Sequence, residues 1–217
     1  MAVRREPQVT PATKATERIA AYIDGFNLYF GIRKEGRRHL WLDLEALMRS
    51  LLRPHQELVA IRYFTAHVRN DPPAEHRQQM YLRALAAHSS VLDIRRGRFQ
   101  QKTRTCYSCQ ARWDDYEEKE TDVSLAISLV EDALNGLYDT ALLVSADSDM
   151  APAIRALRRL VPDGRVLAAV PPNRRSPRLQ AICDATIPIG MAKIRQSQLP
   201  DTVIAGSRRL TRPDYWK

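Results

Sequence analysis

Aspartates recur where apolar runs of this sequence give way to polar residues. Asp147 and Asp149 follow the apolar residues 141–144, and Asp24 closes the apolar run 18–24. Two carboxylates so close together repel each other unless a cation or a proton lies between them. Capping of the helix that follows is the alternative role for Asp149, but capping does not need a second carboxylate two residues earlier. The pair therefore predicts a site that binds a cation.

Short apolar runs alternate with amphipathic stretches along the chain. Strands that alternate with helices form right-handed βαβ units in a parallel sheet covered on both faces. We therefore expect an α/β fold of three layers, with Asp24 and Asp147 at the carboxyl edge of the sheet, where such folds bind ligands. The expected strands are 18–24, 58–66, 91–99, 140–146, 165–170 and 186–189. One helix is expected to begin near Leu28, and the other expected helices span 42–52, 72–88, 119–137, 150–160 and 177–185.

Asp122 and Asn27 are further polar residues near this edge. Asp122 precedes an apolar stripe at helical spacing, which we expect to be buried: Val123, Ala126, Ile127, Val130 and Leu134. Its carboxylate either interacts with the helix dipole or joins the other three aspartates. Asn27 is the expected N-cap of the helix near Leu28. Oxygen ligands of this kind suit Mg²⁺ or Mn²⁺, and two such ions about 4 Å apart activate water at a phosphodiester.

The composition favours a polyanionic partner. The chain of 217 residues has a formal charge of +9 and a pI of about 9.8. Carboxylates at a site that acts on RNA repel the phosphate backbone, so neighbouring Lys and Arg side chains are needed to offset this repulsion. The chain supplies such flanks at Arg95, Arg96, Arg98, Lys102 and Arg104, and at Arg174, Arg175 and Arg178. Neither an apolar leader nor a run of 18 apolar residues is present, so we expect no membrane partner and a cytoplasmic location.

Three segments resemble the signature segments of the NYN domain family, which are PIN-like metal-dependent ribonucleases with a Rossmannoid fold. They are YIDGFNLY (22–29), KETDVSLAISLV (119–130) and LLVSADSDMAPAI (142–154), and the resemblance covers most of 18–190. It implies an endoribonuclease that uses Mg²⁺ or Mn²⁺ and binds RNA. The ligands that it implies are Asp24, Asp122, Asp147 and Asp149, with Asn27 on the metal-bound water or substrate and Ser145 as support for the site.

One residue departs from the family pattern. Members often carry another acid two turns into the helix of Asp122, where this chain has Ser128. Asp132 follows one turn later, on what we expect to be a different helical face. The alternative function is therefore an RNA-binding regulatory protein with weak or no catalysis. A phosphatase of the haloacid-dehalogenase type is disfavoured, because it needs a second aspartate at the position of Phe26. The sequence also contains neither of the phosphate-binding loop motifs GxGxxG and GxxxxGK[ST].

The segments outside this pattern are expected to be peripheral. We predict a flexible basic arm over 1–17, an inserted hairpin or loop over 100–117 and a basic C-terminal tail over 191–217. The insertion carries Cys106 and Cys109 as a CxxC pair, which is half of a structural zinc site. The missing ligands would come from His88 or from a second copy of the chain in a homodimer. Two reduced, structural cysteines are the simpler interpretation.

Overall fold

The computed structural model describes residues 16–217, apart from the side chains of residues 99–101 and 114–118. Its centre is a seven-stranded sheet in the order β4-β3-β2-β1-β5-β6-β7, in which β4 is antiparallel to β3 and the other six strands are parallel. The predicted α/β fold with a mainly parallel sheet is confirmed. The strands are β1 (Glu17–Asp24), β2 (Gln56–Ala66), β3 (Leu92–Thr105), β4 (Arg112–Lys119), β5 (Thr140–Val144), β6 (Arg165–Val170) and β7 (Ala185–Pro188). The predicted arm lies outside the described residues, except for its last two positions.

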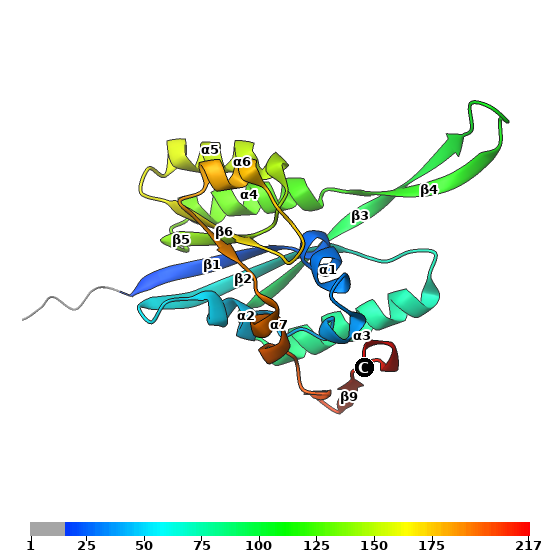
Figure 1. Ribbon diagram of the computed structural model, residues 1–217, viewed down its shortest axis with the longest axis horizontal. Coiled ribbons are helices and arrows are strands. Elements are labelled where there is room, and N and C mark those ends of the chain that lie inside the picture. Colours follow the sequence, from blue (N-terminus) through cyan, green and yellow to red (C-terminus); the bar gives the residue numbers. More distant parts are fainter. Residues whose placement is uncertain (1–15) are drawn as a thin grey trace, which may run out of the picture.

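Helices cover both faces of the sheet and complete the three layers (Figure 1). One face carries α1 (Gly25–Arg33), α2 (Leu44–Leu51), α3 (Pro72–His88) and α7 (Met191–Gln196), and the other carries α4 (Thr121–Leu134), α5 (Ala151–Leu160) and α6 (Pro177–Ile182). Side chains alternate along β1 because successive residues of a strand point to opposite faces. Ile19, Ala21 and Ile23 enter the first core, and Ala20 and Tyr22 enter the second.

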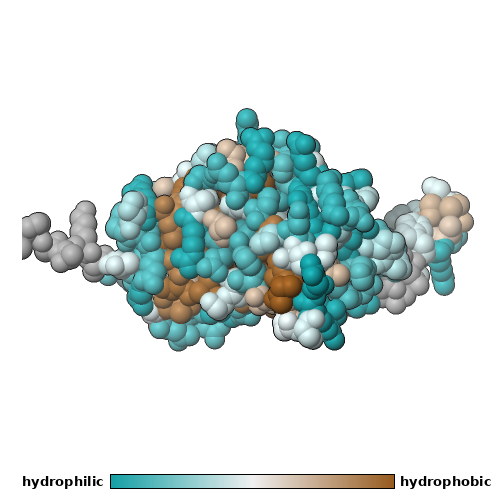
Figure 2. Space-filling model, turned by 90° about the horizontal axis from the view of Figure 1, so that it is seen from below, coloured by the Kyte–Doolittle hydropathy of each residue, from teal (hydrophilic) through white to brown (hydrophobic). Residues whose placement is uncertain are grey.

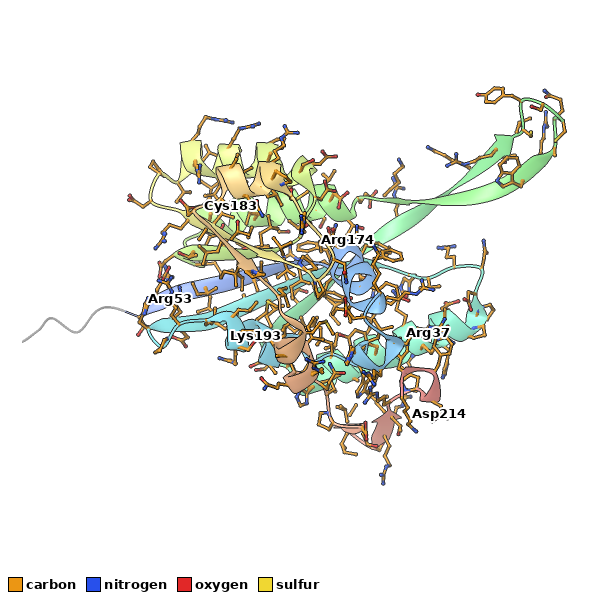
Figure 3. All side chains as sticks on the ribbon, in the orientation of Figure 1. Arg37, Arg53, Arg174, Cys183, Lys193 and Asp214 are labelled. Carbon is orange, nitrogen blue, oxygen red and sulfur yellow. The ribbon has the colours of Figure 1, made fainter. Side chains whose placement is uncertain are left out.

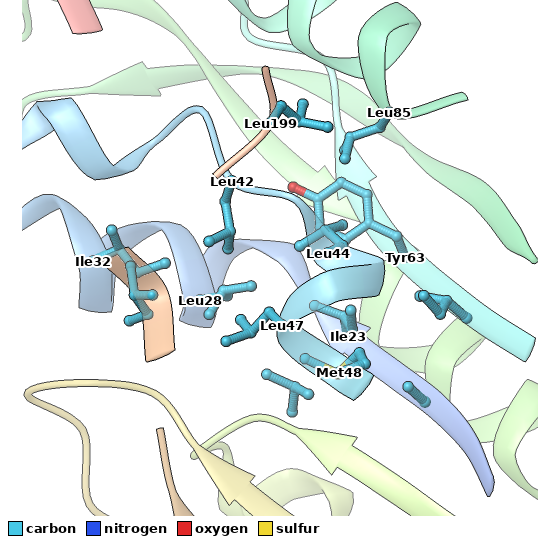
Figure 4. Packing of buried hydrophobic residues seen from close by; sticks show 14 of the residues in the cluster. Ile23, Leu28, Ile32, Leu42, Leu44, Leu47, Met48, Tyr63, Leu85 and Leu199 are labelled. Atoms are coloured by element: carbon cyan, nitrogen blue, oxygen red, sulfur yellow. The ribbon is translucent and has the colours of Figure 1, made fainter. Parts of the chain in front are cut away.

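The first core is the larger of the two and fixes β1, α1 and α2 relative to each other. Ile23, Leu28 and Leu47 pack together in it, with Tyr63 of β2 close by (Figure 4). Asp43 caps α2, because its Oδ1 accepts a hydrogen bond of 3.0 Å from the Ala46 amide. This packing holds the carboxyl end of β1, where Asp24 lies, against a rigid layer.

The buried face of α4 differs from the predicted one. Val123, Ile127 and Leu134 are exposed by 61%, 58% and 57%, so the prediction that their stripe is buried is wrong. The helix instead buries Leu125, Ser128, Leu129 and Asp132, which follow the same helical spacing. Two polar residues in that set hide it from a search for apolar periodicity.

The C-terminal segment is folded onto the domain, so the prediction of a tail over 191–217 is also wrong. It contains α7, a hairpin of β8 (Thr202–Ala205) and β9 (Arg208–Thr211), and a final 3₁₀ turn over Asp214–Trp216. Its apolar residues enter the first core, and they are separated by basic residues that make the segment polar on average: Ile194, Leu199, Val203, Leu210 and Trp216. The Trp216 ring lies 5.9 Å from that of Tyr81 and 6.3 Å from that of Trp41.

The insertion over 100–117, which the sequence predicts to be a hairpin or a loop, is a hairpin. Strands β3 and β4 pair from Arg98 with Lys119 to Thr105 with Arg112, and carry the CxxC at their tip away from the body (Figure 1). The tip is closed by hydrogen bonds from the Cys106 amide to Ala111 and from the Gln110 amide to Cys106. From below, the body is mainly hydrophilic with separate apolar patches (Figure 2). Among the described residues, no helix combines the length and apolarity that a membrane crossing requires.

Candidate acidic site

Asp24 is buried where β1 ends and α1 begins, with only 5% of its surface exposed. Its Oδ1 accepts a hydrogen bond of 2.9 Å from the Asn27 amide, and its Oδ2 accepts from the Asn27 side chain and, at 3.0 Å, from the Ser145 hydroxyl. Asp24 is therefore the N-cap of α1, and the prediction that Asn27 caps this helix is wrong. Asn27 lies in the first turn, where its amide group orients the Asp24 carboxylate.

Ser145 connects the ends of β1 and β5. Its fully buried hydroxyl donates to Asp24 and accepts a hydrogen bond of 3.0 Å from the Asp147 amide. The Oδ1 of Asp147 in turn accepts 2.9 Å from the Asp149 amide and caps a 3₁₀ turn over Ser148–Met150. The helix-capping alternative for Asp149 is wrong, because Met150 is the N-cap position of α5 and no side chain caps that helix. The carboxylate of Asp149 remains exposed.

Asp122 lies in the first turn of α4, where its carboxylate is repelled by the charges of the other three aspartates. Its pKa is raised, first by burial and then by the charges of Asp24, Asp147 and Asp149. The same carboxylate would gain stability from the positive end of the helix dipole, so the repulsion and burial outweigh that gain. The structure therefore brings the four predicted aspartates to one edge of the sheet, with a charge excess that a cation would relieve.

The hairpin and α4 meet beside Asp122. Glu120 has a φ of 80°, which is unusual for a residue with a side chain and turns the chain sharply from β4 into α4. Its carboxylate forms an ion pair with Arg98 on β3. The base of the hairpin is thus tied to the first turn that carries Asp122.

The donor chemistry of the cluster fits a hard divalent cation. All four side chains offer carboxylate oxygens, which Mg²⁺ and Mn²⁺ prefer. Within the described part of the chain, no three His, Cys, Asp or Glu side chains are close enough together to hold one ion directly. Mg²⁺ usually binds to only one or two carboxylates directly and keeps several waters, so its binding does not require three.

Ser128 and Asp132 lie together on the buried face of α4, so the expectation of different faces is wrong. Ser128 accepts a hydrogen bond from Arg95 and donates 2.6 Å to the Ser124 carbonyl. Asp132 accepts 2.8 Å from the Tyr22 hydroxyl and 3.1 Å from Arg62. Both polar groups are therefore occupied in fastening α4 to the sheet. Sequence reasoning missed this network because its members are distributed over four elements, α4, β1, β2 and β3.

The predicted RNA-binding residues differ in their surroundings. Arg95 is the least available, because it bonds to Asp93 at 2.9 Å as well as to Ser128. Arg96, the next residue of β3, is exposed, and Arg98 forms an ion pair with Glu120. Arg96, Arg98, Lys102 and Arg104 are exposed at alternate positions of β3, so they share one face of the hairpin. Arg175 and Arg178 are exposed in the separate segment after β6, whereas Arg174 is half-buried there.

The cysteine pair is separated from the histidine proposed for it. Cys106 and Cys109 lie at the hairpin tip, whereas His88 ends α3 in the body and its Nε2 is 3.0 Å from the Asp43 carboxylate (Figure 1). The pKa of Cys106 is lowered by the backbone amides of Cys109 and Ser108, and further by the Cys109 side chain. No zinc ligand beyond this pair is therefore assigned among the described residues.

Comparisons with known proteins agree on the fold and give two different functional associations. The family model described as "NYN domain" matches residues 18–190. A 6-hydroxy-3-succinoylpyridine 3-monooxygenase from Pseudomonas putida is 28% identical, over 92% of this chain and 75% of its own length. A crystal structure of a protein of unknown function from Vibrio parahaemolyticus has a TM-score of 0.53 and 19% identity, over 82% of this chain and 96% of that one.

Proposed function

Because the chain belongs to the NYN domain family, a family of PIN-like nucleases, we propose that it is an endoribonuclease that uses Mg²⁺ or Mn²⁺ at its acidic site. The observation that carries this proposal is the convergence of Asp24, Asp122, Asp147 and Asp149, expressed in the raised pKa of Asp122. The net charge of +9 supports a polyanionic substrate, because the acids by themselves would repel it.

Each residue of the site has a role that follows from its position. Asp147 and Asp149 lie in the turn after β5, Asp24 lies at the start of α1 and Asp122 at the start of α4. One or two of these carboxylates would bind the cation directly, and the others would bind it through its waters. Ser145 and Asn27 hold the Asp24 carboxylate in place, since both donate hydrogen bonds to it. When bound, such a cation activates water and stabilises the leaving oxygen of a phosphodiester. The exposed basic face of the hairpin would hold the RNA backbone.

The test compares metal-dependent cleavage by the wild type with that by Asp147→Asn. Asparagine caps a turn about as well as aspartate, so the variant keeps the local fold while losing a charged ligand. The exposed Asp163 lies in a turn before β6, so Asp163→Asn is the matched control. We expect cleavage of single-stranded RNA with Mg²⁺ or Mn²⁺, no cleavage with chelator, and loss only in Asp147→Asn. Cleavage by Asp147→Asn at the wild-type rate would refute the assignment.

A regulatory RNA-binding protein is the second candidate. Ser128 favours it, because the side chain that replaces the family's additional acid is buried and bonded to Arg95. This candidate predicts salt-dependent RNA binding without turnover in any metal. Chelator-sensitive turnover in a preparation free of contaminating nuclease excludes it.

The monooxygenase relative provides a further control for the same preparation. At 28% identity its activity does not transfer by similarity, and this chain lacks the GxGxxG loop typical of dinucleotide-binding domains. Oxidation of NADH in the presence of a hydroxypyridine, with no RNA cleavage, would favour oxygenase chemistry over the nuclease proposal.

A further inference from the structure

A pocket opens beside the start of α1, the helix that Asp24 caps. It has a volume of about 320 Å³ and lies between α1, α3 and the C-terminal turn. Its lining starts at Gly25 and Phe26, the two residues that follow Asp24. Tyr63 forms part of the same wall, and its pKa is raised to about 12, mainly by burial and also by the charge of Asp24. One wall of the pocket therefore begins at the residue that follows Asp24.

Aromatic rings with open surfaces line this pocket. Tyr29, Phe30 and Tyr215 are exposed by 37%, 42% and 47%. The rings of Phe26 and Phe30 are almost parallel, with an interplanar angle of 18°, and Tyr29 meets Phe30 edge to face at 5.2 Å. Large aromatic side chains that gather on the surface usually mark a binding site. The accessible rings of Tyr29 and Phe30 suit a flat aromatic ligand.

Three arginines make the same pocket positive. The guanidinium groups of Arg37 and Arg77 lie 4.3 Å and 4.2 Å from the centre of the Tyr215 ring, and Arg33 lies 5.9 Å from that of Tyr29. Within the described residues, none of the three has a carboxylate ion-pair partner. Asp71 also lines the pocket, but its carboxylate caps α3 through the Ala74 amide. The ligand favoured by this chemistry is therefore both aromatic and anionic.

The C-terminal segment completes the pocket. Tyr215 and Trp216 lie beyond the residues 18–190 that match the family. Trp216 is buried against Trp41 and Tyr81, which anchors the turn that presents Tyr215. Figure 3 labels Arg37 and Asp214 at this corner of the molecule. The pocket thus depends on residues outside the matched domain.

We propose that this pocket binds one unpaired nucleotide of the RNA whose backbone lies at the acidic site, with the base stacked on the aromatic rings and a phosphate beside the arginines. The proposal rests on the nuclease function and specifies its substrate as single-stranded RNA. A paired base cannot enter, because it is stacked within its helix. Base stacking on aromatic side chains tolerates any base, so the pocket selects for strand state more than for sequence.

Binding of a short single-stranded RNA that contains 2-aminopurine tests this proposal without relying on cleavage. The assay uses full-length protein with chelator present, and reads anisotropy for affinity and fluorescence quenching for stacking. Phe30→Ala and Tyr215→Ala alter half-exposed rings, so both variants should fold. We expect each to bind about tenfold more weakly or worse, with quenching lost. Arg33→Ala should lower the slope of log affinity against log salt by about 0.7.

Two controls separate this pocket from other aromatic surfaces and ligands. Tyr107→Ala removes a ring that is 99% exposed at the hairpin tip, and it should keep the wild-type quenching. Double-stranded RNA should produce no quenching. Equal quenching in Phe30→Ala, Tyr215→Ala and the wild type would overturn the proposal, as would saturation of the pocket by a pyridine carboxylic acid that leaves RNA binding unchanged.

The nuclease function and this inference fail in distinguishable ways. Metal-dependent cleavage with unchanged binding by both ring variants would overturn the pocket and leave the nuclease standing. Quenching that depends on Phe30 and Tyr215, without cleavage in any metal, would support the pocket and refute the nuclease. Neither cleavage nor quenching would overturn both.

Discussion

Ser145 and Asp24 are 121 positions apart in the sequence, yet the Ser145 hydroxyl donates a hydrogen bond of 3.0 Å to the Asp24 carboxylate. Both groups are buried, so neither has water as an easy substitute. The bond fixes the carboxyl end of β1 against that of β5. It also determines where one of the four acids points.

Replacement of Ser145 by alanine should therefore reduce activity more than stability. Residues that orient a metal-binding carboxylate typically contribute about 10–100-fold to metal affinity or activity. We expect Ser145→Ala to lower the cleavage rate by that factor at limiting Mg²⁺, with partial recovery at high Mg²⁺, and to cost about 1–2 kcal/mol of unfolding free energy. Titration of the rate with Mg²⁺ and urea denaturation measure the two effects. Ser148→Ala, in the neighbouring turn, is the control, and equal rates in both variants would contradict the role of Ser145.

Asp122 should make the metal-free protein less stable at neutral pH. Its folded pKa is raised by burial and by the other three aspartates, so the folded state holds this proton more tightly than the unfolded state. Stability must then fall as the pH rises through the range between the unfolded and folded pKa values. We expect Asp122→Asn without metal to raise the melting temperature at pH 7 by roughly 1–3 °C, with the gain shrinking towards pH 4.

Addition of Mg²⁺ completes this experiment. The cation should raise the melting temperature of the wild type more than that of Asp122→Asn, since it relieves the repulsion that the variant has already lost. Thermal melts at several pH values, with chelator or with Mg²⁺, give both results. A lower melting temperature for metal-free Asp122→Asn at pH 7 would contradict the electrostatic interpretation.

Asp132 should contribute more to the free energy of unfolding than to the activity of the acidic cluster. Its removal leaves the buried Tyr22 hydroxyl without its acceptor, and leaves Arg62 with only Asp93, at 3.2 Å. Breaking a buried pair from one side is costly, and we expect Asp132→Ala to lose about 2–4 kcal/mol in urea denaturation. The adjacent Glu131 is exposed, so Glu131→Ala should change stability by no more than about 0.5 kcal/mol. Similar losses in both variants would show that α4 is not held by this network.

The cysteines should differ in reactivity. Backbone amides lower the pKa of Cys106, whereas burial raises that of Cys183 to about 11. The thiolate is the reactive form, so iodoacetamide at pH 7.5 should modify Cys106 at least about tenfold faster than Cys183. Peptide mass spectrometry over time measures both rates. Protection of Cys106 that ends on addition of chelator would instead reveal bound zinc, whose further ligands would then come from a second copy of the chain.

The sequence was most informative where one local pattern determines both element and position. An apolar run that ends in an acid predicted β1 with Asp24 and β5 with Asp147, because a parallel sheet collects such ends at one edge. The cap positions differ from the predicted ones: Asp24 rather than Asn27 caps α1, and Asp147 caps the 3₁₀ turn before α5. Capping depends on where the first turn begins, and a shift of a few residues changes the capping side chain.

Other features depend on contacts between distant segments, so local patterns did not predict them. The buried face of α4 was wrongly predicted because Ser128 and Asp132 find polar partners on β2 and β3, which makes a polar face the inward one. The basic composition of the C-terminal segment predicts a tail. Its apolar residues are isolated in sequence, and only the fold gathers them around Trp216.

The central place of β1 in the sheet has a consequence for folding of the chain during its synthesis on the ribosome. Strand β1 is made early but pairs with β5 on one side, more than a hundred residues later. Such distant pairing is slow to form. The nascent chain therefore carries Asp24 without its partners until the region of Asp149 has emerged, and the pocket wall at Tyr215 is made later still. A protein proposed to cut RNA would thus lack its complete acidic site until the region of Asp149 has left the ribosome.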